Sequence, residues 1–331
     1  MKFQAKPLSI LMLSSVIAAP VFATELTVYT YSSFTSSWGP GPQIKEAFEA
    51  ECDCTLTFVS SDDGVSLLNR VRLEGANTQA DVILGIDDAL IAEARALGVA
   101  QSHSINWADY PMAADLQWSD NTFVPFDYGY FAFVYDSETN TKPVTSLDDL
   151  LRSNVSIVYQ DPRTSTVGQG LMLWMNAVYG DDVAGAWEAL AERTVTVTSG
   201  WSAAYGMFLE GEADYVLSYT TSPAYHVVAE STDRYKALAF SEGHVAQIEV
   251  GAISAHTNQP ELAEQFLAFL LSSTAQEIIP VTNWMLPVRT DVNLPDVFAE
   301  LPQPERIGFT SEEVYTNRQN WIREWRNAVS Q

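Results

Sequence analysis

Aromatic and hydroxyl side chains are concentrated between Gly200 and Tyr225. The aromatic members are Trp201, Tyr205, Phe208, Tyr215, Tyr219 and Tyr225, and the hydroxyl members are Ser202, Ser218, Thr220, Thr221 and Ser222. Aromatic faces stack on flat rings and attract cations, while hydroxyl groups orient polar atoms. The segment therefore predicts a site for a flat, partly charged organic molecule.

Two loops elsewhere carry residues that could contact the same molecule. Asp63 either only caps the helix that follows it, or also pairs with a cation or an amine, and Gly64 would let a ligand approach the backbone. Ser165 and Thr166 either cap a helix or supply hydroxyls and exposed amides to an acceptor-rich group such as phosphate. Arg163 could support a phosphate or pair with a carboxylate. The spacing leaves these choices open.

Three tryptophans stand in predicted loops beside small or polar residues: Trp38, Trp201 and Trp284. Most tryptophans pack in protein cores, but a loop position with small neighbours suits a rigid stacking wall. Three aromatic residues of the 200–225 segment fall inside a predicted helix or strand and are expected in the core: Tyr205, Phe208 and Tyr215.

The sequence contains no short motif of hydrolase, metalloprotease or nucleotide-binding chemistry. The four histidines lack the spacing of a helical metal pair and suit hydrogen-bonding or surface roles: His103, His226, His244 and His256. Cys52 and Cys54 form either a local disulfide or two free thiols, and an oxidising compartment favours the disulfide. We therefore expect no catalytic residue, no metal site and no cofactor.

The first 23 residues read as a secretory signal peptide. Lys2 and Lys6 precede an apolar run over residues 8–19, which is shorter than the ~20 residues of a membrane-spanning helix, and a small-residue cleavage site follows at 21–23. The whole chain has a net charge of −25, and loss of the two lysines would make it more acidic still. This charge argues against nucleic acid or an anionic membrane as a partner. We expect an exported, periplasmic monomer.

Strand and helix patterns alternate along the chain, as in α/β proteins. Strands are predicted at 26–30, 55–59, 80–84, 156–159, 194–198 and 215–219, and helices at 41–50, from Asp63, from Asp87 or Asp88, from Thr145 or Ser146 to 152, at 167–179, from Asp181 or Asp182 to 193, at 203–210, from Pro260 and from Thr310. An apolar strand pattern over 123–135, broken at Pro125 and Gly129, and a second extended segment over 238–253 predict two crossovers.

These crossovers divide the chain into two α/β lobes. Lobe 1 would comprise residues 24–125 and 250–331, and lobe 2 residues 126–249. Ligands of open α/β sheets bind in loops at the carboxyl ends of strands, and the predicted site residues follow such strands. Two hinged lobes can close on a solute between them.

Several long runs closely resemble the periplasmic thiamine-binding proteins of bacteria, the solute receptors of thiamine ABC importers. The resemblance covers essentially all of the chain after the signal segment, including the Cys-x-Cys pair. The runs that carry it are residues 26–31, 38–42, 63–70, 123–135, 159–166, 194–198, 200–202 and 217–226.

The resemblance implies a two-lobed type II periplasmic binding protein fold with a hinged interlobe cleft. It also implies thiamine, thiamine monophosphate and thiamine diphosphate as ligands, and the permease of an ABC importer as partner. The family's ligand contacts fall on Asp63, Gly64, Ser165, Thr166, Trp201, Tyr219, Thr220, Thr221 and Ser222, and further aromatic members would be Tyr31, Trp38, Tyr225 and Trp284.

Two other functions compete with a thiamine receptor. Thiamine-degrading transferases have a similar fold and use a cysteine nucleophile, but Cys52 and Cys54 precede a predicted strand and lie away from the expected cleft loops. Ferric-ion receptors of related architecture commonly use adjacent tyrosines, and this chain has no Tyr-Tyr pair.

Overall fold

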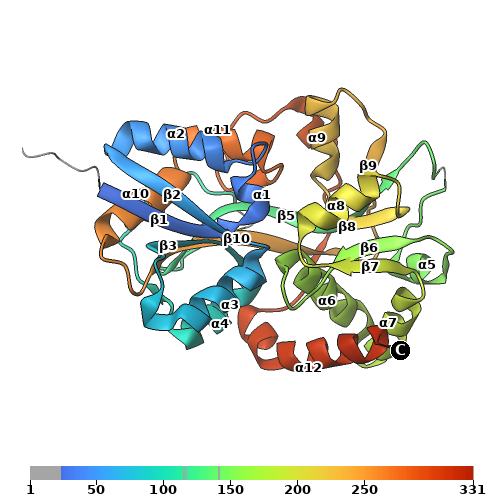
Figure 1. Cartoon of the computed structure of the whole chain (residues 1–331). Coiled ribbons are helices and arrows are strands. Elements are labelled where there is room, and N and C mark those ends of the chain that lie inside the picture. The colour runs from blue at the N-terminus through green and yellow to red at the C-terminus, as the bar shows by residue number, and fades with distance from the viewer. Residues whose placement is uncertain (1–23, 115, 117, 141, 331) are drawn as a thin grey trace, which may run out of the picture.

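Two long antiparallel strands, β5 (Phe123–Asp136) and β10 (His244–Ser254), run through the middle of the molecule (Figure 1). The computed structural model describes residues 24–114, 116, 118–140 and 142–330, so the expected signal peptide lies outside the described residues. A 12-stranded sheet is built around this pair, with the order β2-β1-β3-β10-β5-β8-β6-β7 along its main path.

Parallel strands lie on both sides of the central pair. β1 pairs in parallel with β2 and β3, and β6 pairs in parallel with β7 and β8. The main strands are β1 (Thr24–Tyr31), β2 (Cys54–Ser61), β3 (Val82–Asp87), β6 (Ile157–Gln160), β7 (Thr194–Thr198) and β8 (Tyr215–Tyr219). Four short strands complete the sheet: β4 (Ala100–Gln101), β9 (Tyr235–Ala237), β11 (Leu286–Pro287) and β12 (Arg306–Ile307).

Helices cover the sheet on either side of the central strands (Figure 1). They are α1 (Ser32–Thr35), α2 (Gly41–Cys52), α3 (Gly64–Glu74), α4 (Ile91–Leu97), α5 (Leu147–Arg152), α6 (Thr166–Tyr179), α7 (Val183–Ala191), α8 (Trp201–Leu209), α9 (Ser222–Ala229), α10 (Pro260–Leu270), α11 (Ser273–Thr282) and α12 (Ser311–Val329). None of these helices combines the length and apolar character needed to cross a bilayer.

Polar caps start the helices where the sequence predicted them. Asp63 caps α3, Ser165 caps α6, and Asp87 caps the short 3-10 helix Asp88–Leu90 that leads into α4. At α12, Thr310 and Glu313 form both halves of a capping box. Local sequence therefore fixes several loop-to-helix junctions at the carboxyl ends of strands.

The predicted break in the strand at Pro125 and Gly129 is wrong, because β5 is continuous from Phe123 to Asp136. The register between β5 and β10 instead shifts between Glu249 and Val250, where Phe126 is the additional residue of β5. A bulge of this kind accommodates a proline, which has no N–H to donate to the ladder.

Buried side chains form two large clusters, one on each side of the central pair. The first contains Val28, Phe34 and Leu84, and the second contains Trp174 and Trp187. The two clusters and the connecting strands β5 and β10 agree with the two-lobed α/β fold predicted from the sequence.

The last helix packs across the molecule. Val314 and Trp325 of α12 belong to the second cluster, although residues 250–331 were assigned to lobe 1. Arg318 of α12 also contacts Glu93 on α4 and Gln169 on α6, and so connects both sides of the molecule. Where the two lobes divide as moving units stays a prediction.

The two cysteines form the expected local disulfide. Cys52 ends α2, Cys54 begins β2, and Asp53 between them has a left-handed conformation with a φ of 50°. The bridge lies at the edge of the sheet, since β2 is the first strand in the sheet order.

Candidate functional site

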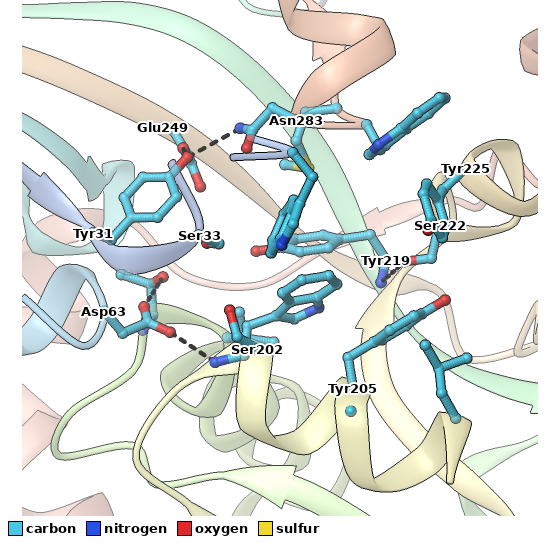
Figure 2. A pocket seen from close by; sticks show the side chains of 18 residues that line it. Tyr31, Ser33, Asp63, Ser202, Tyr205, Tyr219, Ser222, Tyr225, Glu249 and Asn283 are labelled. Carbon is cyan, nitrogen blue, oxygen red and sulfur yellow. Dashed lines mark hydrogen bonds between the residues drawn. The ribbon is translucent and has the colours of Figure 1, made fainter. Parts of the chain in front are cut away.

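A cavity of about 250 Å³ lies between the two core clusters, near the carboxyl ends of β1, β2, β7 and β8 (Figure 2). Its wall is mainly aromatic, with a few hydroxyl, amide and carboxylate groups. The lining residues are Tyr31, Ser33, Trp38, Asp63, Thr166, Val167, Trp201, Ser202, Tyr205, Gly206, Leu209, Tyr219, Ser222, Tyr225, Glu249, Asn283, Trp284 and Met285.

One wall of the cavity is a fixed aromatic stack. Trp201, the first residue of α8, stacks on Tyr205 with ring centroids 4.8 Å apart and an interplanar angle of 22°. The Trp201 indole N–H also donates to Ser218 Oγ at 2.7 Å, and Tyr205 Oη lies 2.8 Å from His226 Nε2. These contacts hold the indole in one orientation, which reduces the entropy that a ligand must overcome on stacking.

Aromatic side chains from other elements complete the wall. Trp38 lies 6.0 Å from Trp201 between ring centroids, and Tyr225 meets Trp284 edge to face at 5.5 Å. Trp284 has a φ of 57°, which is uncommon for a bulky residue and often accompanies functional loops. The cavity is therefore enclosed by rings from both sides of the molecule.

The Asp63 carboxylate joins the beginnings of three helices. Asp63 caps α3 and accepts hydrogen bonds from Gly64 N at 2.7 Å and from Trp201 N, at the start of α8, at 3.3 Å. It also accepts from Ser165 Oγ at 2.8 Å and from Thr166 N and Oγ1, both at 3.1 Å, at the start of α6.

The convergence of N–H groups suits a negative charge, because a helix N-terminus carries a partial positive charge. Burial raises the pKa of Asp63, and the hydrogen bonds from Ser165, Gly64 and Thr166 oppose that rise. Since α3 packs with the first cluster and α6 with the second, Asp63 holds the two sides of the cavity together.

The 161–166 loop makes several structural contacts, and a ligand contact of Ser165 or Thr166 stays a prediction. Ser165 Oγ accepts from Val167 N and Gly168 N at 3.1 and 3.3 Å, and is therefore a helix cap as well as a donor to Asp63. Arg163 pairs with Asp161 rather than lining the cavity.

A buried polar network forms the floor beneath Tyr31. Tyr31 Oη donates to Glu249 Oε2 at 2.6 Å and accepts from Asn283 Nδ2 at 3.0 Å (Figure 2). Asn283 Nδ2 also donates to Asp127 Oδ2 at 2.7 Å, and Tyr219 Oη donates to Gln247 Oε1 at 3.1 Å. The hydrogen bonds that Glu249 and Asp127 accept in this floor come from uncharged side chains.

Nine predicted residues line the cavity: Tyr31, Trp38, Asp63, Thr166, Trp201, Tyr219, Ser222, Tyr225 and Trp284. The other four lie behind the wall: Gly64, Ser165, Thr220 and Thr221. Thr220 and Thr221 are buried, and Thr221 precedes α9. The structure thus brings all thirteen into one region, and their contact with a ligand stays a prediction.

Sequence reasoning missed part of the wall. Tyr205, Phe208 and Tyr215 are core residues as expected, but Tyr205 also lines the cavity. Glu249 and Asn283 were not singled out at all. A signal was present for Glu249, because a carboxylate within the apolar run of β10 requires a special environment. No comparable pattern marks Asn283, which follows α11.

Two histidines, His226 and His244, have the hydrogen-bonding roles expected for them. His226 contacts Tyr205 and Glu230, and His244 bonds to the backbone of Phe131 and Phe240. Among the described residues, no group of three His, Cys, Asp or Glu side chains could hold a metal ion.

Comparisons with known proteins identify the family of this chain. The family model for bacterial extracellular solute-binding proteins matches residues 26–280. The thiamine-binding periplasmic protein of Escherichia coli is 54% identical over 321 residues, covering 94% of this chain and 96% of that protein. The protein of the same name from Haemophilus influenzae is 43% identical, covering 92% of each.

Solved structures give the same result for the fold. A periplasmic thiamin binding protein superimposes with a TM-score of 0.90 and 53% identity, covering 93% of this chain and 96% of that one. A ferric binding protein from Campylobacter jejuni superimposes with a TM-score of 0.76, covering 92% of this chain and 99% of that one, but at 18% identity it shows a shared fold alone.

Proposed function

This chain belongs to the thiamine-binding periplasmic proteins, within the bacterial extracellular solute-binding proteins, and we propose that its interlobe cavity captures thiamine and thiamine phosphates for an ABC importer. One observation supports thiamine above all. Seven lining side chains are aromatic and two are carboxylates, and none of the described lining residues is Lys, Arg or His.

This composition matches the chemistry of thiamine, which has a neutral aminopyrimidine and a permanently cationic thiazolium. Aromatic faces attract a desolvated cation by up to about 2 kcal/mol each. Trp201 and Tyr225 would supply such faces, while Tyr31 and Trp38 would close the opposite side. Asp63 would offset the charge or accept from the pyrimidine amine.

The phosphate esters need hydrogen-bond donors. The α6 N-terminus offers Ser165 and Thr166, and the loop from Tyr219 to Ser222 offers further hydroxyls. Helix N-termini favour anions, so this side would suit a hydroxyethyl group or its phosphates. The α6 donors bond to the Asp63 carboxylate, so a phosphate would have to share them or displace the carboxylate.

A receptor role is favoured over thiamine-degrading chemistry by the state of the cysteines. Both sulfurs are joined in the Cys52–Cys54 disulfide at the sheet edge, so neither is the free thiol that such a nucleophile requires. We propose that the protein is not an enzyme and works as a monomer with its membrane permease.

Calorimetry on unfolded and refolded, ligand-free protein tests the proposal. Thiamine, its monophosphate and its diphosphate should each bind tightly with 1:1 stoichiometry. If thiamine gives no binding heat and the phosphates do not compete with it for the site, the assignment is wrong. Long incubation of thiamine with the protein and a nucleophilic amine should return intact thiamine. Native mass spectrometry of protein purified without refolding should detect the co-purifying ligand.

A further inference from the structure

Three buried acidic residues lie side by side across neighbouring strands under the cavity. In the sheet register, Glu249 on β10 is opposite Asp87 on β3 and opposite Asp127 on β5. Their exposed fractions are 6%, 2% and 0%, respectively. Directly opposite residues have Cβ atoms about 5 Å apart, and like charges in such positions repel. We call Asp87, Glu249 and Asp127 the acidic row.

Neutral groups supply the hydrogen bonds of the acidic row. Glu249 accepts from Tyr31 Oη at 2.6 Å and from Gln247 Nε2 at 2.8 Å. Asp127 Oδ2 accepts from Asn283, while its buried Oδ1 has no hydrogen-bond partner among the described residues. An ionised pair here would lack a compensating cation, and an unpaired buried charge is strongly unfavourable.

The surroundings of Glu249 are also acidic or neutral. Two arginines lie near the row, and both pair with other carboxylates: Arg318 on α12 acts on Asp87 but pairs with Glu93, and Arg306 on β12 pairs with Asp88. The groups that face Glu249 from the packed elements are Tyr31 on β1, Asp63 before α3, Asp87 on β3, Asp127 on β5, Tyr219 on β8, Gln247 on β10 and Asn283 after α11.

The acidic row therefore retains protons that isolated carboxylates would lose. Burial, followed by repulsion from Asp127, raises the pKa of Glu249 well above its usual value. Burial raises the pKa of Asp127 to about 8, and burial and Asp88 raise the pKa of Asp87. Near neutral pH the row holds protons when no cation is present.

Glu249 is the one member of the row that lines the cavity, beside Tyr31 and Asn283 (Figure 2). A cationic ring held there would favour the ionised carboxylate by direct attraction. We propose that Glu249 is the counter-charge that selects a cationic ligand, and that arrival of the cation expels a proton from the acidic row to solvent. The inference rests on thiamine as ligand and identifies the group that recognises its charge.

The balance is one proton for one positive charge. The ligand-free site has a protonated carboxyl, and the complex has a carboxylate beside the cation plus a released proton. Affinity for thiamine should therefore rise with pH over the range in which the free protein holds this proton, by as much as tenfold per unit while one whole proton is released. It should fall as the pH drops below neutral.

Calorimetry in buffers with different ionisation enthalpies measures this proton directly. At about pH 7, where the acidic row holds a proton in the free protein, thiamine should release close to one proton per site from the wild-type protein. The thiophene analogue of thiamine, in which carbon replaces the charged ring nitrogen, should bind more weakly and release none. Glu249→Gln should bind thiamine at least tenfold more weakly, without proton release, and should bind the neutral analogue as the wild type does.

Two controls separate the possible outcomes. Glu261→Gln, in the exposed first turn of α10, should behave as the wild type with both ligands. Comparing Glu249→Gln with the wild type at each pH removes the contribution of the ligand's own aminopyrimidine, which also takes up a proton in acid. If Glu249→Gln does not fold, the proton count and the two ligands still test the inference in the wild type.

Tight thiamine binding without proton release, with equal affinity for the neutral analogue, would overturn the role of the acidic row and leave the receptor function intact. Failure of the wild-type protein to bind thiamine at all would instead overturn the proposed function. Proton release that persists in Glu249→Gln would assign the proton to a group other than Glu249 and would also overturn the inference.

Discussion

Replacing Trp201 by alanine removes the central ring of the cavity wall while leaving its supports in place. Tyr205 remains packed beneath, and the backbone N–H of residue 201 can still donate to Asp63. Alanine is a good helix former, so α8 should still begin at this position. Ligand affinity should therefore fall much more than the stability of the fold.

The expected loss follows from the two interactions that the indole offers a ligand. A desolvated cation–π contact is worth up to about 2 kcal/mol, and ring stacking adds roughly 0.5–1.5 kcal/mol. A total of about 2–3 kcal/mol corresponds to a roughly 30- to 150-fold rise in the Kd for thiamine. Trp201→Phe keeps a ring but loses the 2.7 Å bond to Ser218, so its Kd should rise by no more than about tenfold.

Titration calorimetry with refolded, ligand-free protein measures both Kd values, and thermal unfolding checks the fold. Tyr315→Ala is the matched control, because Tyr315 is a half-exposed aromatic residue on α12 that does not line the cavity. A Kd for Trp201→Ala within threefold of the wild-type value, with normal Tyr315→Ala behaviour, would refute the stacking role of Trp201.

Three other changes test separate parts of the structure. Asp63→Asn places an amide donor against N–H and O–H donors, so thiamine should dissociate at least tenfold faster in stopped-flow fluorescence. The control Asp62→Asn, at an exposed position, should behave as the wild type. Equal dissociation rates for Asp63→Asn and the wild type would contradict the bridging role. Because the pKa of Asp127 is raised, its contribution to stability is fully present below a normal carboxyl pKa and is lost as the pH rises to about 8. Between acidic and alkaline buffer, the Tm of the ligand-free wild type should therefore fall by roughly 5 °C more than the Tm of Asp127→Asn. Parallel Tm curves would refute this assignment. The Cys52→Ser/Cys54→Ser double variant opens a very short loop at the sheet edge, away from the cavity lining. Calorimetry should find unchanged thiamine affinity, and the free energy of unfolding should fall by about 1–2 kcal/mol. Weaker binding would show that the bridge supports the site.

The local parts of the site were predictable because they depend on neighbouring residues. Asp63 and Ser165 cap helices as their sequence context indicates, and each follows a strand whose pattern was readable. Trp284 was recognised from its loop position. Fold class followed from the alternation of strand and helix patterns, supported by the long runs that resemble thiamine-binding proteins.

Other features depend on partners distant in the chain. Tyr205 has the helical spacing of a core residue, and only its position beneath Trp201 places it on the cavity wall. Pro125 suggested a broken strand because a proline cannot donate to a ladder, but the partner strand β10 accommodates it through a register shift. The packing of α12 against the second cluster likewise depends on tertiary contacts of Val314 and Trp325.

By itself the sequence determined the α/β class, the helix starts, the aromatic and hydroxyl composition of the site, and the family. Those properties depend on residue type and short-range periodicity, or on long runs of residues shared with relatives. Only the tertiary structure placed Glu249 between Asp87 and Asp127 and set the Asp63 carboxylate against three helix N-termini. Burial, strand register and the absence of basic side chains among the described lining residues decide those electrostatics, and each arises only when segments far apart in sequence meet.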